Sequence, residues 1–263
     1  MGNDITLPVE MKPDLGMFCI SLRPFHKIEL IHAPPVVAAC VRRVANEVNG
    51  LYAKGDSFET PSKDKLGVLQ FSMSALLFVT GNGKEPATLG KLFCIRLLEE
   101  LHKLGYDLQI GSDLTRPPKW FGPHSARFAA GTLFFRKVSS ERPTAKVVCV
   151  APGKADTIVL LNHNEKVKSM VENVIKDAWP SGIQRQEEQQ VLGHTVHDIK
   201  MNGYPWWTSE ANIDNNRIIN MIVQNLSKIN LRLVGGINIK GGTDSLFFMG
   251  DPTSSNAQFC SIS

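Results

Sequence analysis

The sequence contains one pattern twice, and this repetition limits the possible folds more than any other feature. Residues 92–114 read LFCIRLLEELHKLGYDLQIGSDL, and residues 217–239 read RIINMIVQNLSKINLRLVGGINI. A shift of 125 positions places apolar residues on apolar residues, as it does for Leu97 and Ile222. Apolar residues at helical spacing, followed by a short break and a second apolar run, predict an amphipathic helix, a tight turn and a strand in each segment.

The repetition extends into the rest of each half. A shift of 130 places Cys19 on Cys149, and a shift of 126 aligns residues 67–79 with residues 193–205. Each half also closes on a strand that ends in two adjacent phenylalanines. Matches that follow the same order at nearly the same offset are hard to obtain by chance. We therefore interpret the chain as two similar halves.

Each half is predicted to contain, in order, strand, strand, helix, strand, helix, strand and strand. So many hairpins and so few helices disfavour a doubly wound sheet and favour an α+β fold, with a mixed or antiparallel sheet covered by two helices. We expect a first repeat at 16–138 and a second at 145–250, with a flexible arm at 1–15 and a flexible tail at 251–263. The short linker at 139–144 favours two halves that pack as one pseudo-symmetric body.

Composition and charge argue against several classes of function. The chain has 263 residues, of which 43% are hydrophobic, and this is enough to bury a core without disulfides or metal. The net charge of +4 is dispersed, with no run of five like charges, so nucleic-acid binding is not expected. The five cysteines lie far apart without a CxxC pair, and we expect neither a metal nor a cofactor. The absence of an apolar signal segment and of any run of 18 apolar residues predicts a cytoplasmic protein.

The sequence ends in CSIS, which matches the C-a-a-X pattern for prenylation of Cys260. Serine in the last position is typical of a farnesyl acceptor. The polar residues that precede the motif reach a transferase pocket more easily than a packed strand does. The alternative is a chance cysteine four residues from the end, since a pattern with one fixed letter is common.

The sequence begins with MGNDIT, which matches the pattern for N-myristoylation of Gly2. The alternative is coincidence, because chains that begin with Met-Gly are common. A single lipid gives only marginal membrane binding, and stable attachment takes two signals. Gly2 and Cys260 together predict peripheral attachment to the cytosolic face of a membrane.

Aromatic residues gather on two loops rich in proline and glycine. The first loop carries Trp120 and Phe121, and the second carries Tyr204, Trp206 and Trp207. Tryptophan and tyrosine on such loops often anchor protein interfaces, so these five residues are candidates for binding a protein partner. The alternative is that the rings fold back over the core as lids.

His194, His197 and Asp198 form the densest group of residues that bind metals or transfer protons. The two histidines are three positions apart on a predicted strand, so they point to opposite faces and are poorly placed to share a metal. We interpret them as surface histidines on an edge strand. The glycine pairs at 235–236 and 241–242 do not match a phosphate loop, and no known catalytic motif is present.

Two functions remain compatible with the sequence. The first is a non-catalytic protein-interaction module, held at a membrane surface by terminal lipids, whose protein partner the sequence does not identify. The second is a soluble protein, or an enzyme, that holds a small ligand in the groove between the two halves. The lack of a catalytic set makes an enzyme the less expected of the two.

Overall fold

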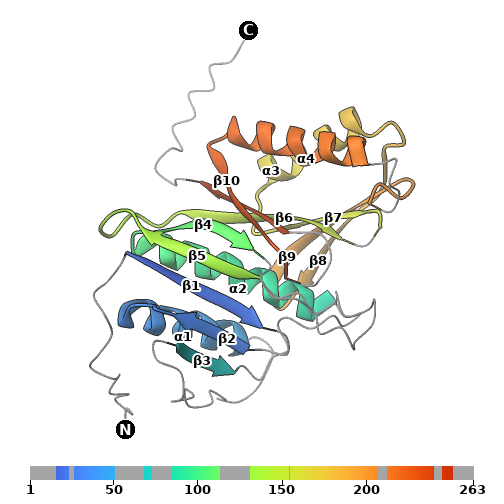
Figure 1. The fold of residues 1–263 in the computed structure, drawn as a ribbon. Helices are drawn as coiled ribbons and strands as arrows, with labels where there is room; N and C mark the ends of the chain where they lie inside the picture. The colour runs from blue at the N-terminus through green and yellow to red at the C-terminus, as the bar shows by residue number, and fades with distance from the viewer. Residues whose placement is uncertain are drawn as a thin grey trace, which may run out of the picture.

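Two antiparallel sheets and four helices make up the described part of this computed structural model. The structure describes residues 16–23, 27–50, 68–72, 84–112, 131–153, 155–206, 212–239 and 245–250. Sheet A has five strands in the order β3-β2-β1-β5-β4, and sheet B has six strands in the order β10-β11-β6-β7-β9-β8. Helices α1 and α2 belong to the half that forms sheet A, and helices α3 and α4 to the half that forms sheet B (Figure 1).

The bounds of the elements follow the predicted order closely. The first half consists of β1 (Met17–Arg23), β2 (Lys27–Ile31), α1 (Pro35–Gly50), β3 (Val68–Ser72), α2 (Lys84–Lys103), β4 (Tyr106–Ser112) and β5 (Thr132–Lys137). The second half consists of β6 (Lys146–Gly153), β7 (Thr157–Leu161), α3 (Glu165–Ala178), β8 (Ile183–Val191), β9 (His194–Met201), α4 (Asn212–Ser227), β10 (Leu231–Ile237) and β11 (Ser245–Gly250). The predicted α+β class is confirmed, and all the strand pairs are antiparallel rather than mixed.

The second half contains one strand more than the sequence predicts. Strand β8 reads IQRQEEQQV and is mostly exposed, so it lacks the apolar alternation by which strands are recognised. It pairs along its whole length with β9, to which Leu192 and Gly193 connect it with positive φ angles. Charged and amide side chains are typical of an edge strand, since they discourage pairing with other chains.

The strand registers make the two halves comparable residue by residue. Cys19 pairs with Ile31 in sheet A, and Cys149 pairs with Leu161 in sheet B. The β4–β5 and β10–β11 pairs both contain a register shift. It follows Leu108 in β4 and the equivalent Leu233 in β10. Strands β3 and β9 are equivalent, but the predicted shift between them was wrong by two residues. The strand registers relate them by 128 positions rather than 126.

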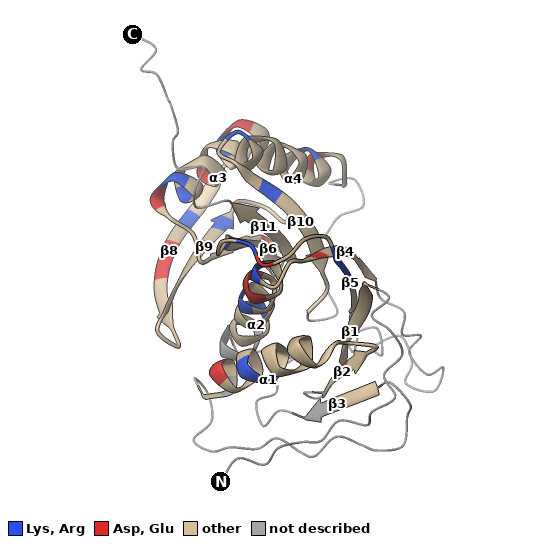
Figure 2. Ribbon diagram, turned by 90° about the vertical axis from the view of Figure 1, so that its left-hand side faces the viewer, with Lys and Arg blue, Asp and Glu red and all other residues tan. Residues whose placement is uncertain are grey.

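The two halves share one hydrophobic core because α2 lies between the sheets. Sheets A and B approach each other along β4 and β10 and diverge from there, and α2 fills the angle between them (Figure 2). One core cluster accordingly combines residues of α2 and both sheets, whereas a second cluster joins the far face of sheet B to α3 and α4. Helix α2 therefore packs against its own sheet on one side and against sheet B on the other.

The sequences of α2 and α4 explain their different positions. Leu92 and Ile95 of α2 are buried, whereas the equivalent residues of α4, Arg217 and Asn220, are exposed. An apolar surface on both sides suits a helix between two sheets, and a single apolar stripe suits a helix that faces water. The α3–α4 layer thus closes one end of the molecule with polar side chains.

Candidate functional site

The face of sheet A that points away from α1 and α2 has no described helix over it (Figure 2). Phe18 and Ile20 of β1 are buried in the core, and successive residues of a strand point to opposite faces. This assigns to the outer face of sheet A the side chains of Met17, Cys19, Ser21, Glu29, Ile31, Val68, Gln70, Ile110, Thr132, Phe134 and Arg136. Ser21 and Thr132 are buried and lie within hydrogen-bond distance of each other, so their part of the face is not open to solvent.

An apolar row crosses all five strands on this outer face. The strand registers place Val68, Ile31, Cys19, Phe134 and Ile110 side by side in that order. Ile110 is 58% exposed, and the other four are partly buried. Burial, followed by the charge of Glu29, raises the pKa of the Cys19 thiol, so this member of the row is uncharged at neutral pH. Together the five residues form an apolar band on one face of the sheet.

The equivalent row of sheet B has nearly the same residues, but it is fully covered. Val196, Leu161, Cys149 and Phe247 lie side by side there, and each is at most 3% exposed. They belong to the core cluster that contains α2. The same row of side chains is therefore covered by a helix in one half, while no described helix covers it in the other.

A buried carboxylate fastens α2 to sheet B. Glu99 of α2 accepts hydrogen bonds from the Val147 N–H at 3.0 Å and from Asn162 Nδ2 at 3.3 Å. Its other oxygen accepts from Arg96 Nη1 at 3.0 Å. The bond to Val147 satisfies a backbone donor of β6 at the point where β7 has ended. Glu99 thus fixes where the helix lies on the sheet.

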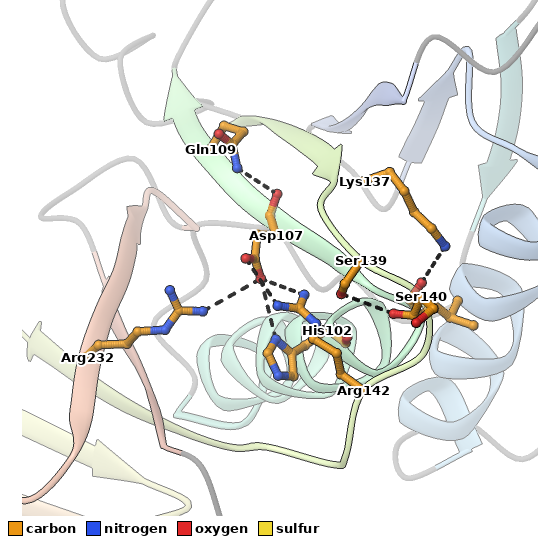
Figure 3. Close-up of polar contacts among 9 residues, drawn as sticks. His102, Asp107, Gln109, Lys137, Ser139, Ser140, Arg142 and Arg232 are labelled. Carbon is orange, nitrogen blue, oxygen red and sulfur yellow. Dashed lines mark hydrogen bonds and ion pairs between the residues drawn. The ribbon is translucent and has the colours of Figure 1, made fainter.

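A second polar cluster joins the linker between the halves to both sheets (Figure 3). Arg142 Nη2 donates to Asp107 Oδ1 at 2.7 Å and Arg142 Nη1 donates to Oδ2 at 3.2 Å. His102 Nδ1 lies 3.4 Å from the same carboxylate, and Arg232 of β10 lies 3.6 Å from it. Burial and the neighbouring Arg142 lower the pKa of His102, so this ring is neutral at pH 7. The cluster holds the linker in place.

Replacing Asp107 with asparagine is expected to remove a pH-dependent part of the stability. Burial alone raises the pKa of Asp107, but the hydrogen bonds and charge of Arg142, with the charge of Arg232, outweigh this effect and lower it. A lowered carboxyl pKa stabilises the folded protein above pH ~4 and ceases to do so as the pH falls through the folded-state value. We expect Asp107→Asn to reduce the free energy of unfolding by roughly 1–3 kcal/mol at pH 7.

Urea titrations between pH 7 and pH 3 test this expectation. The difference between the original protein and Asp107→Asn is expected to shrink as the solution is acidified. Asp177→Asn, which alters an exposed carboxylate of α3, serves as the control and is expected to leave stability nearly unchanged. A difference that stays constant over the whole pH range would contradict the role given to the carboxylate.

A small pocket lies where β4 and β10 come together. Its volume is about 100 Å³ and its lining consists of Gly111, Ser112, Gly131, Leu133, Gly236, Ile237 and Asn238. Gly111 and Gly236 are equivalent in the two halves, and a Cβ added to Gly111 would lie 2.8 Å from the Gly236 carbonyl oxygen. Pockets for small organic ligands usually enclose roughly 300–1,000 Å³. This pocket is the place nearest to the predicted groove, and its size suits a few water molecules better than such a ligand.

The structure changes the interpretation of the histidine cluster. His197 is 1% exposed and lies on β9, which is an inner strand between β7 and β8, so it is neither on the surface nor on an edge. Its Nε2 lies 3.2 Å from Glu172 of α3. The sequence hid this contact because α3 and β9 are far apart along the chain. Within the described ranges, no group of three or more His, Cys, Asp and Glu side chains is arranged to hold a metal ion.

Two of the predicted partner-binding aromatics lie in the described residues. Tyr204 is 65% exposed. Trp206 packs against the second core cluster, and its Nε1 donates to the Thr157 carbonyl oxygen at 3.2 Å. Trp206 thereby closes a corner of the second half, and Tyr204 remains accessible beside it. A role for either residue in partner binding stays a prediction.

The other sequence-predicted site residues fall outside the described residues. They are Gly2, Trp120, Phe121, Trp207 and Cys260. The predicted arm at 1–15 and the predicted tail at 251–263 also lie there, so their conformations stay predictions. No helix in the described ranges is long and apolar enough to cross a membrane.

Comparison with known proteins adds one finding. A model of a protein family matches residues 146–249, and its description assigns the domain no function. The match runs from β6 to β11 and so corresponds to the half that contains sheet B. No curated protein and no solved structure matches the chain.

Proposed function

We propose that the protein is a non-catalytic interaction module that binds a protein partner through the outer face of sheet A. The observation that carries this proposal is the apolar row, which is covered by α2 in sheet B and by no described helix in sheet A. Contiguous apolar surface bordered by polar residues is typical of protein interaction sites. Glu29 and Arg136 supply such a polar border on either side of the row.

We further propose that lipids on Cys260 and Gly2 hold this module at the cytosolic face of a membrane. The support is the pair of sequence patterns at the two ends of the chain. Two lipids together give the stable attachment that one does not. A partner protein at the same membrane would then meet the outer face of sheet A at a raised local concentration.

Photo-crosslinking in eukaryotic cells tests both parts of the proposal. The full-length chain carries benzoylphenylalanine at position 134, in the middle of the apolar row, or at position 217, on the exposed side of α4. We expect a membrane-bound adduct with one protein from position 134 only, and Ile31→Lys in the same row is expected to abolish it. An absence of adducts, or equal adducts from both positions, would refute binding by this face.

The lipids are measured in the same preparation. The intact mass is expected to include a farnesyl group that Cys260→Ser removes and a myristoyl group that Gly2→Ala removes. Both variants are expected to move from the membrane fraction to the soluble fraction. An unmodified chain in the soluble fraction would refute the membrane attachment and would leave the crosslinking result to be judged separately.

A further inference from the structure

We propose that the outer face of sheet A binds an amphipathic helix of the partner protein, which carries a carboxylate that meets Met17 and His32. This inference rests on the proposed function and specifies its partner. The model for the complex is present in the molecule itself, since α2 binds the equivalent face of sheet B through Glu99.

The two faces carry similar side chains. The buried row of sheet B contains Val196, Leu161, Cys149 and Phe247, and the row of sheet A contains Val68, Ile31, Cys19 and Phe134. At these four successive positions the two rows have the same residue, except that Ile31 of sheet A corresponds to its isomer Leu161 in sheet B. The fifth position differs, since Gly235 of β10 corresponds to Ile110 of β4. A surface that fits the side chains of a helix in one half presents nearly the same shape in the other.

A backbone donor lies at the start of each central strand, β1 in sheet A and β6 in sheet B. Leu22 N–H donates to Gly131 O and Lys137 N–H donates to Gly16 O, so the even-numbered residues of β1 bond toward β5. Odd-numbered residues therefore bond toward β2, which ends at Ile31, the partner of Cys19. The next odd-numbered residue of β1 is Met17, and its N–H points in the same direction but lies beyond the end of β2.

The Val147 N–H has the same place in sheet B. It lies one step beyond the end of β7, where Leu161 pairs with Cys149. There it donates to Glu99 of α2. A carboxylate on a bound helix would fill the corresponding place beside Met17 in sheet A.

A residue that can donate a hydrogen bond from its side chain lies beside each of these backbone groups. Asn162 donates to Glu99 from a residue with a left-handed backbone, at φ 56°. The equivalent residue of the first half is His32, at φ 55°, and its side chain is exposed. Few non-glycine residues adopt this conformation, so its presence at both positions indicates the same local geometry. His32 is placed to donate to a carboxylate as Asn162 does.

The border of the face distinguishes the partner helix from α2. Val159 and Met249 flank the row in sheet B, and Glu29 and Arg136 occupy the equivalent positions in sheet A. The partner helix is therefore expected to carry charges of opposite sign at its flanks. A second copy of this chain does not offer such a helix on its α3–α4 side, because Arg217 and Asn220 replace the apolar Leu92 and Ile95 of α2 there. Gln224 likewise replaces the Glu99 carboxylate.

A synthetic peptide with the sequence of residues 84–103 is the probe for this inference, because it carries the α2 stripe and its Glu99 carboxylate. Fluorescence anisotropy measures its binding to the purified full-length chain. We expect Phe134→Lys in the protein to weaken binding at least tenfold. The peptide with Glu99→Gln is expected to bind roughly tenfold more weakly, which is the usual loss for one charge-assisted hydrogen bond.

Variants of His32 test the inference without unfolding the protein, because the His32 side chain is exposed. His32→Leu is expected to weaken binding about threefold to tenfold, and His32→Asn, which copies Asn162, is expected to preserve it. Asn220→Lys on the outer side of α4 serves as the control and is expected to change nothing.

Several outcomes would overturn the helix inference. They are no binding at 200 µM peptide, equal binding by Phe134→Lys, and equal binding of the two peptides. Equal binding by Phe134→Lys would show that the peptide exchanges with α2 itself. A failed peptide test combined with a specific adduct from position 134 would leave the interaction function standing and refute only the helical partner.

Discussion

Gly105→Ala is expected to reduce the free energy of unfolding by about 4 kcal/mol or more, which is an exceptional loss for one methyl group. Gly105 has φ +85°, a conformation that costs a residue with a side chain roughly 1–2 kcal/mol. A Cβ there would lie 2.2 Å from the Ser139 carbonyl oxygen and 2.3 Å from that of Ser140. The linker would have to move away, and the bonds from Val138 and Ser139 to the Gly105 carbonyl would be lost.

Gly182→Ala is the matched control for this prediction. Gly182 has φ +69°, and a Cβ added to it meets no atom within 4 Å. It therefore isolates the cost of the backbone conformation, and we expect a loss of only about 1 kcal/mol. Urea titration at pH 7 measures both variants. Equal losses would show that the contact with the linker is unimportant.

Glu99→Ala is expected to reduce the free energy of unfolding by about 2–4 kcal/mol, since it leaves a buried backbone donor without an acceptor. The Val147 N–H loses its acceptor, and Asn162 Nδ2 keeps only its 2.7 Å bond to the Val147 carbonyl oxygen. Glu99 itself is 7% exposed. Glu99→Gln keeps one acceptor oxygen, so it is expected to lose less, about 1 kcal/mol. Thermal and urea unfolding report these differences.

The equivalent residue of α4 provides the control. Gln224 occupies the position of Glu99 in the second half and is exposed. We expect Gln224→Ala to change stability by less than about 0.5 kcal/mol. If Gln224→Ala reduced the free energy of unfolding as much as Glu99→Ala does, Glu99 would stabilise the protein only through its helix propensity. The role of Glu99 in joining α2 to sheet B would then be wrong.

The sequence predicted the architecture well because its apolar pattern was repeated. The helical spacing of apolar residues in 92–114 predicted α2, and the second apolar run of the same segment predicted β4. Strand β8 was missed because six of its nine residues are Gln or Glu, which carry no apolar period. Its place in the fold is set by the backbone bonds to β9, which a single sequence does not reveal.

The candidate site was harder to predict than the fold. The match of Cys19 with Cys149 was visible, but sequence spacing alone does not show which face of a strand a helix covers. The row formed with Ile31 and Phe134 emerges only from the strand registers. The two apolar sides of α2 are visible in the sequence and indicate a helix that is buried on both sides, as between two sheets.

The place of α2 between the sheets also bears on how the chain is made. During synthesis the first half leaves the ribosome before the second, so the side of α2 that binds sheet B has no partner until β6 to β11 have followed. An exposed apolar helix at this stage is prone to aggregation or to capture by chaperones. The polar cluster around Asp107 gains Arg142 with the linker, and Arg232 joins it only when β10 has followed. The apolar side of α2 therefore stays exposed from the middle of translation until sheet B folds over it.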